Sequence, residues 1–337
     1  MNKRAVRADL LLLLTAGIWG FGFVAQRSGM EYVGPFTYNA IRFILGSVSL
    51  LPLILYFKSG RAKNPENQDK KKSAGTAFRA SFLAGSLLFV AVVLQQFGIM
   101  FTTVGNAGFI TGLYVVLTPI FGIALGKKTG VPTWIGAVCT LGGLYFISAA
   151  GRVNRVNPGD ILTIASAVFW SFHVLLIDRL VQKTDPLILS SGQFAWCGFY
   201  AFIATLLFEP AVPSWMSFIA PGFPLQPWLS LPEFAAALTG RITPGTFPLG
   251  DALIPILYGG LASVGIAYTL QVVAQKDAPP AHATIILCLE GCFAALGGVI
   301  ILSEHLGPWT ILGSILMLSG MLITQWEVVR NAPKIHS

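Results

Sequence analysis

The sequence predicts an all-α polytopic membrane protein with ten transmembrane helices, arranged as two inverted five-helix repeats. Three observations lead to this prediction. Of the 337 residues, 54% are hydrophobic and 11% are charged, with a mean hydropathy of +0.71, whereas soluble domains carry about 25% charged residues. Ten apolar runs alternate with polar or Pro/Gly-rich segments, and a run of about 20 residues crosses a bilayer. The third observation is a similarity between the two halves of the chain.

The ten apolar runs are predicted to be helices because lipid offers backbone groups no hydrogen-bond partner, which excludes open strands. The first run follows a basic segment and imitates a signal peptide. No small-x-small cleavage site follows it, and Gln26-Arg27 lies where a spanning helix should end, so we expect a membrane helix. We expect the fourth helix to end early, at Lys127-Lys128. The predicted spans are residues 10–26, 36–57, 80–101, 104–126, 131–150, 161–180, 187–208, 252–274, 280–302 and 307–326.

The distribution of basic residues predicts the orientation. With a cytoplasmic N-terminus, 17 of the 22 Lys and Arg residues fall on the cytoplasmic side and four on the outer side, with Arg42 inside a span. Because cytoplasmic loops are enriched in Lys and Arg, both termini are predicted to be cytoplasmic. Residues 58–79 form a basic cytoplasmic link. The insert 209–251 contains eight prolines and is predicted to lie outside, at the membrane interface.

An internal similarity predicts a duplication. Sliding the chain by 151 residues places Asp9 on Asp160, Trp19 on Trp170, Pro35 on Pro186 and Phe43 on Phe194; farther on, residues 118–121 fall on residues 290–293. We therefore predict a first repeat at residues 1–150 and a second at residues 151–337, which contains the Pro-rich insert. Because each repeat has an odd number of helices, the second enters the membrane from the opposite side. Inverted repeats are typical of secondary transporters with a site near mid-bilayer.

Three stretches resemble the EamA family of the drug/metabolite transporter superfamily. They are residues 18–23 (Ile-Trp-Gly-Phe-Gly-Phe), residues 106–119, which end in Leu-Thr-Pro, and residues 289–296 followed by Leu302-Ser-Glu-His-Leu-Gly307. Gly291 departs from the proline that is usual there. The resemblance implies an inner-membrane carrier of small metabolites, amino acids or drugs, often an exporter, whose helices 1 to 4 and 6 to 9 enclose the cavity. Its partners would be a small-molecule solute and the lipid bilayer, with protons as the candidate coupling ion.

Two charged residues lie well inside predicted spans, Arg42 in the second and Glu290 in the ninth. Charges within spans are costly and are by default functional candidates. An arginine stays protonated, whereas a buried carboxylate can become neutral. These properties indicate Arg42 as an anchor for an anionic or zwitterionic solute and Glu290 as a proton-sensitive counter-charge. The alternative is a structural ion pair between the two halves.

Further candidate substrate-binding residues are polar or aromatic side chains within the spans. The polar ones would hydrogen-bond a solute in a wet cavity or only join helices. His173 is either a proton relay or a packing histidine, and the two equivalent tryptophans either wall a cavity or pack against glycines. The set consists of Asn39, Gln95, Gln96, Thr111, His173, Gln193 and Gln271, with Trp19, Trp170 and Tyr114.

Other classes of function lack their motifs. The sequence has no zinc-binding HExxH, no GxGxxG or P-loop and no GxSxG, so we expect no enzyme, cofactor or metal. The four cysteines form no CxxC pair, and the basic residues separate apolar runs instead of forming a nucleic-acid-binding face. A secondary carrier is predicted, with export as the first choice. Uncoupled facilitative exchange and a non-transporting membrane interaction protein stay open, as does the oligomeric state.

Overall fold

The chain folds into a bundle of α-helices, as the sequence predicts. The computed structural model describes residues 3–62, 74–102, 104–149, 158–209, 249–302 and 307–330. Ten helical segments run through this part of the chain, and each overlaps one predicted span. In chain order they are α1 (Lys3–Gly29), α2 with α3 (Pro35–Ser49, Leu51–Ala62), α4 (Ala74–Phe101), α5 with α6 (Val104–Thr111, Tyr114–Ala124), α7 (Val131–Ala149), α8 (Pro158–Val181), α9 (Pro186–Phe208), α12 with η3 and α13 (Leu249–Leu257, Tyr258–Tyr268, Thr269–Ala274), α14 with α15 (Pro280–Leu287, Glu290–Leu302), and α16 (Pro308–Arg330).

Seven of these segments are long and apolar enough to cross a membrane by length and composition. The other three contain shorter apolar helices, at Tyr114–Ala124, Val131–Gly143 and Ile311–Ile323. Large apolar side chains on the outside of the bundle, such as Leu10, Val138 and Ile254, are more than 60% exposed. Polar side chains such as Asn39 and Arg42 are instead buried. This pattern fits contact with lipid, and the protein is an integral membrane protein.

Proline begins five of the helices: α2, α8, α9, α14 and α16. Proline suits a first helical turn, because its missing N–H would have no partner there. At α9, the side chain of Asp185 also accepts a hydrogen bond from the Leu187 N–H at 3.0 Å. These helix starts are therefore specified by local sequence. Most of the predicted Pro-rich insert, residues 210–248, and part of the basic link, residues 63–73, lie outside the described residues, so their predicted roles stay predictions.

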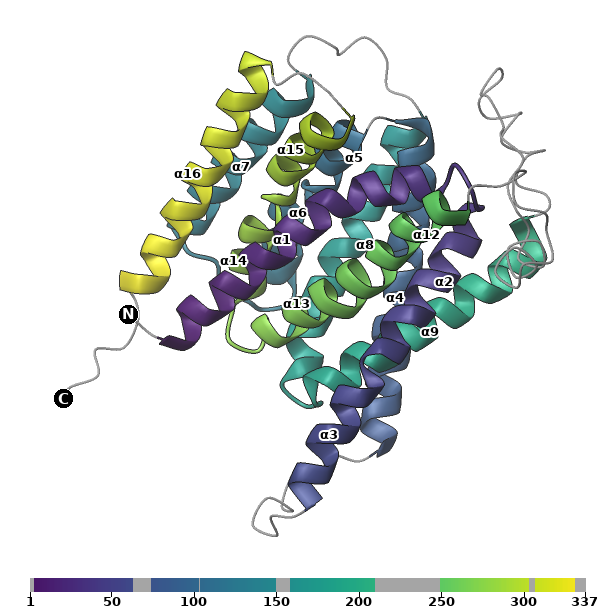
Figure 1. Cartoon of the computed structure of the whole chain (residues 1–337). Helices are drawn as coiled ribbons and strands as arrows, with labels where there is room; N and C mark the ends of the chain where they lie inside the picture. The colour runs from purple at the N-terminus through teal and green to yellow at the C-terminus, as the bar shows by residue number, and fades with distance from the viewer. Residues whose placement is uncertain are drawn as a thin grey trace.

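Glycines allow α7 and α16 to pack closely along one edge of the bundle (Figure 1). A Cβ on Gly320 would lie 2.6 Å from the Gly136 carbonyl oxygen, and one on Gly143 would lie 2.9 Å from the Met317 nitrogen. Backbones at such distances leave no room for a side chain. By contrast, a Cβ on the neighbouring Gly142 would meet no atom within 4 Å.

We expect Gly143→Leu to lower the thermal midpoint of the detergent-purified protein by several degrees, because forcing atoms into a packed interface costs about 1–3 kcal/mol. Differential scanning fluorimetry measures this. The matched control is Gly142→Leu, which should stay within about a degree of the wild type. Equal midpoints for the two variants would contradict this account of the interface.

A carboxylate directly after α9 caps the start of α2. Glu209 Oε1 accepts hydrogen bonds from the N–H of Phe36 at 3.0 Å and of Thr37 at 3.2 Å, and the Thr37 hydroxyl donates to Oε2. A negative charge at a helix N-terminus is favourable. Burial nevertheless raises the pKa of Glu209 above its usual value, and the hydrogen bonds from Thr37 and Phe36 offset only part of this effect. The folded protein therefore holds this proton to a higher pH than the unfolded chain does.

This raised pKa predicts a pH-dependent stability. A group that binds its proton more tightly in the folded state makes the protein less stable as pH rises from its unfolded pKa, about 4.5, through its folded pKa. The thermal midpoint of the wild type, relative to Glu209→Gln, should therefore fall as pH rises above about 4.5. Glu31→Gln, which removes an exposed carboxylate, should keep the wild-type profile. Parallel profiles for the wild type and Glu209→Gln would refute the prediction.

Candidate solute-binding cavity

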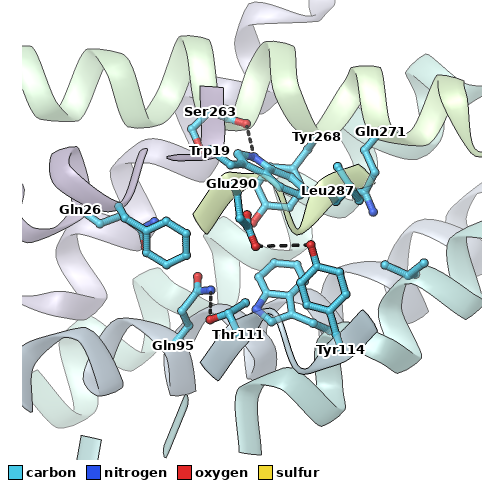
Figure 2. A pocket seen from close by; sticks show the side chains of 13 residues that line it. Trp19, Gln26, Gln95, Thr111, Tyr114, Ser263, Tyr268, Gln271, Leu287 and Glu290 are labelled. Carbon is cyan, nitrogen blue, oxygen red and sulfur yellow. Dashed lines mark hydrogen bonds between the residues drawn. The ribbon is translucent and has the colours of Figure 1, made fainter. Parts of the chain in front are cut away.

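A cavity lies in the middle of the bundle, between helices from both halves of the chain (Figure 2). The centre of a water molecule can occupy about 30 Å³ of it, which is room for about two waters. At this size the cavity has to widen before it admits a metabolite. The lining residues are Trp19, Phe23, Gln26, Gln95, Thr111, Tyr114, Trp170, Val174, Ser263, Tyr268, Gln271, Leu287 and Glu290.

Three aromatic rings form one wall of the cavity. The ring centroids of Trp19 and Tyr268 are 4.5 Å apart, those of Trp170 and Tyr268 are 5.9 Å apart, and those of Trp19 and Trp170 are 6.4 Å apart. The two tryptophans that the sequence places at equivalent positions therefore meet through Tyr268. Trp19 Nε1 also donates to the Ser263 carbonyl oxygen at 3.3 Å. Ser263 and Tyr268 both belong to η3, a π-helix of 11 residues, and π-helical segments are frequent at functional sites.

Two broken helices meet at the cavity. Two-residue turns at Gly112-Leu113 and Cys288-Leu289 separate α5 from α6 and α14 from α15. Cys288 Sγ donates to the Gly112 carbonyl oxygen at 3.3 Å, across the two breaks. Both α5 and α14 have eight residues, so the breaks pair Tyr114 with Glu290. The alignment of the two halves by sequence pairs Glu290 instead with Thr118, one helical turn after Tyr114. Residue types alone do not show where the backbone hydrogen bonding changes.

Glu290 is the first residue after the second break, and its side chain faces the cavity (Figure 2). The hydroxyl of Tyr114 donates to Glu290 Oε1 at 3.3 Å. Glu290 is only 4% exposed, and it is the single ionisable acid among the lining residues, none of which is basic. Among the described residues, Glu290 is thus paired with a neutral phenol rather than with an opposite charge.

Amide side chains supply most of the remaining polar surface. Gln95 Nε2 donates to Thr111 Oγ1 at 3.1 Å, which joins α4 to α5. Gln271 Nε2 donates to Gln275 Oε1 at 3.0 Å. The side-chain amide oxygens of Gln26 and Gln271 are buried without a hydrogen-bond partner, as is the indole N–H of Trp170. Buried polar groups normally have partners, so these atoms are available to a bound molecule.

A second, larger cavity opens beside the first. The centre of a water molecule can occupy about 360 Å³ of it, and its lining includes Thr118, Asp178 and Gln275. Each of these residues follows by four a residue that lines the central cavity: Tyr114, Val174 and Gln271. Since residues four apart share a helix face, the two cavities are stacked along the same three helices. We call the larger one the vestibule.

Gln275 stands between the central cavity and the vestibule. It is buried, accepts the hydrogen bond from Gln271, and donates from Nε2 to the Val174 carbonyl oxygen at 3.0 Å. It therefore joins α13 to α8. Arg27 follows the lining residue Gln26 and donates from Nη1 to the Ile99 carbonyl oxygen at 2.6 Å, which joins the end of α1 to the end of α4. Hydrogen bonds thus join neighbouring helices next to Gln271 and next to Gln26.

The structure brings together seven of the twelve predicted binding residues around the central cavity. They are Trp19, Gln95, Thr111, Tyr114, Trp170, Gln271 and Glu290. Sequence reasoning missed six lining residues: Phe23, Gln26, Val174, Ser263, Tyr268 and Leu287. The sequence around Gln26 is misleading, because a polar residue at the end of an apolar run is typical of a helix end. Ser263 and Tyr268 of η3 have no signal in the sequence, since nothing in the apolar pattern separates a π-helix from an α-helix.

The other five predicted residues, Arg42, Asn39, Gln96, His173 and Gln193, lie outside the lining of the central cavity. Arg42 is 1% exposed, donates from Nε to Asn39 Oδ1 at 2.9 Å, and places its guanidinium over the rings of Tyr38 and Phe43. No ion pair joins it to Glu290 in the part of the chain that the structure describes.

The remaining three of these side chains are fully buried. His173 Nε2 and Gln193 Oε1 are hydrogen-bonded at 2.9 Å between α8 and α9, and Gln96 lies on α4. The roles of all five residues in solute binding stay predictions.

Comparisons with known proteins show the family to which this chain belongs. The sequence model of the EamA-like transporter family matches the chain twice, over residues 6–149 and 157–326. The chain belongs to the EamA-like transporter family. This confirms the resemblance seen in the sequence, and the protein is a membrane transporter.

Relatives of this EamA-like protein include an uncharacterized transporter of Archaeoglobus fulgidus, 28% identical over 95% of this chain and 86% of the relative. The uncharacterized transporter YoaV of Bacillus subtilis is 23% identical over 97% of this chain and 99% of its own length. A solved crystal structure aligns over 96% of this chain and 98% of its own with a TM-score of 0.68. At 16% identity that match shows a shared fold.

Proposed function

We propose that this protein is a secondary carrier that exports a small metabolite, amino acid or drug by alternating access and uses protons as the coupling ion. The observation that supports it best is Glu290. A lone carboxylate stands at the break of a helix in a cavity that both halves of the chain enclose. Ionisable residues inside spans mark solute and ion pathways, and broken helices near mid-bilayer build the binding sites of such carriers.

The proposed cycle opens the two ends of the cavity in turn. Breaking the contact between Gln275 and Val174 connects the cavity to the vestibule, and breaking the contact between Arg27 and Ile99 connects it to the opposite side. In the orientation that the basic residues predict, with both termini cytoplasmic in the inner (plasma) membrane, the vestibule faces the cytoplasm. The division into inverted repeats at residues 1–150 and 151–337 would make the two openings related motions.

Coupling would act through the charge of Glu290. A proton neutralises the carboxylate, and a solute bound beside it feels that change strongly, because charges interact strongly where water is excluded. Proton entry from one side would thus change the affinity of the cavity for its solute. Uncoupled facilitative exchange lacks this step. A role as a non-transporting interaction protein depends on the insert, most of which lies outside the described residues.

Proteoliposomes test the carrier with three radiolabelled aromatic probes that differ in charge: benzylguanidine, benzylurea and 3-phenylpropionate. A transmembrane pH gradient should drive accumulation of at least one probe. Glu290→Gln should reduce that accumulation at least tenfold, which corresponds to about 1.4 kcal/mol, while Glu31→Gln retains it. Equilibration without accumulation would establish uncoupled exchange, and no protein-dependent movement of any probe would contradict transport.

The contact of Gln275 predicts a second effect. Gln275→Leu removes the donor to the Val174 carbonyl oxygen and should weaken the barrier below the cavity. We expect passive efflux of the transported probe to rise at least threefold and its gradient-driven accumulation to fall correspondingly. Gln182→Leu is the control, because Gln182 also donates to a backbone oxygen, that of Lys276, but at an exposed position. Efflux that rises equally in both variants would argue against Gln275 as the barrier.

A further inference from the structure

We propose that the solute of the central cavity is an organic cation that carries N–H donors, a protonated amine or a guanidinium. This inference rests on the proposed carrier function and adds the chemical class of its solute. Three features of the lining lead to it: an acid without an opposite charge, a wall of aromatic rings, and unpartnered oxygen acceptors.

The first feature is the missing counter-charge of Glu290. The carboxylate is buried, and the lining residues include no Lys, Arg or His. A buried acid without an opposite charge tends to become neutral, whereas a positive charge beside it favours the charged form. A bound cation would therefore supply the missing partner of Glu290. An anionic solute would find no positively charged group among the lining residues.

The second feature is the aromatic wall. Trp19, Trp170 and Tyr268 lie within 6.4 Å of one another by ring centroids, and Glu290 and Tyr114 face the same space (Figure 2). Tryptophan gives the strongest cation–π attraction, and this attraction grows when the cation is desolvated. Rings and carboxylate therefore attract the same kind of head group.

The third feature is the balance of hydrogen-bonding atoms. The side-chain amide oxygens of Gln26 and Gln271 are buried acceptors that receive no hydrogen bond, and the carboxylate of Glu290 can accept further hydrogen bonds. The unpartnered donor among the lining residues is the indole N–H of Trp170. A head group with several N–H donors satisfies this set, whereas a carboxylate, which only accepts, would leave the acceptors unpaired.

Arg42 lies beside the aromatic wall but is not a lining residue. Its guanidinium is held over Tyr38 and Phe43 and bonded to Asn39, its Nη2 is buried without a hydrogen-bond partner, and the Phe43 ring is 6.0 Å from that of Tyr268 by centroids. Glu290, not Arg42, is the acidic or basic residue that lines the cavity. The structure therefore favours a solute cation over the carboxylate that the sequence position of Arg42 alone would favour.

Four probes of similar shape test the charge and the donors separately. Benzylguanidine carries both, benzylurea carries N–H donors without charge, benzyltrimethylammonium carries charge without N–H donors, and 3-phenylpropionate is an anion. Affinities for the detergent-purified full chain are measured by isothermal titration calorimetry. We expect benzylguanidine to bind at least tenfold more tightly than benzylurea and 3-phenylpropionate, and severalfold more tightly than benzyltrimethylammonium.

Two variants assign these differences to residues. Glu290→Gln should weaken the binding of benzylguanidine at least tenfold and change the affinity for benzylurea by less than twofold. Trp19→Leu keeps the acid and should weaken both cations at least fivefold, so the test survives if Glu290→Gln fails to fold. Glu31→Gln should bind every probe as the wild type does.

The proposal is overturned if 3-phenylpropionate or benzylurea binds as well as benzylguanidine, or if a folded Glu290→Gln protein retains its cation affinity. Transport separates this failure from failure of the carrier function. Proteoliposomes that move 3-phenylpropionate or benzylurea in preference to benzylguanidine overturn the cation site and keep the carrier. Tight binding of benzylguanidine without its transport supports the cation site and overturns the carrier.

Discussion

The arrangement of the interior depends on one costly constraint. A carboxyl group is held in the middle of the bundle, in a cavity whose lining residues include no basic side chain. Glu290 occupies the first position after a helix break, where the backbone turns. The Tyr114 hydroxyl meets it from the equivalent position of the other broken helix. Aromatic rings and amide groups then enclose the acid, so the polarity of the site comes from very few atoms.

The two helix breaks make this arrangement possible. In an unbroken helix every interior carbonyl bonds to its own helix. The Gly112 carbonyl oxygen accepts a hydrogen bond from the Val115 N–H at 3.0 Å, within the turn, and a second one from the thiol of Cys288, so the breaks contact each other directly. This contact brings two segments that are 176 residues apart together beside the cavity. The aromatic wall then joins α1, α8 and η3 through Trp19, Trp170 and Tyr268.

The sequence was sufficient to predict the ten helical segments, because apolar runs of membrane length alternate with prolines and charges that act locally. Trp19, Trp170 and Glu290 were also within reach, through the duplication and the rarity of charge inside spans. The helix breaks and the π-helix could not be predicted, since apolar residues continue through both and tertiary contacts determine the backbone hydrogen bonding. Arg42 is as unusual as Glu290 by charge alone, and only packing shows that Tyr38 and Phe43 surround it.

The stacking of the two cavities has a consequence for the size of the movement that transport needs. Residues four apart on a helix are about 6 Å apart along its axis, so Gln271 and Gln275 are separated by little more than the length of an amide side chain. A molecule that passes from one compartment to the next advances by a single step of this kind. In the carrier that we propose, rotation of side chains, with little sliding of whole helices, would be enough to switch that connection.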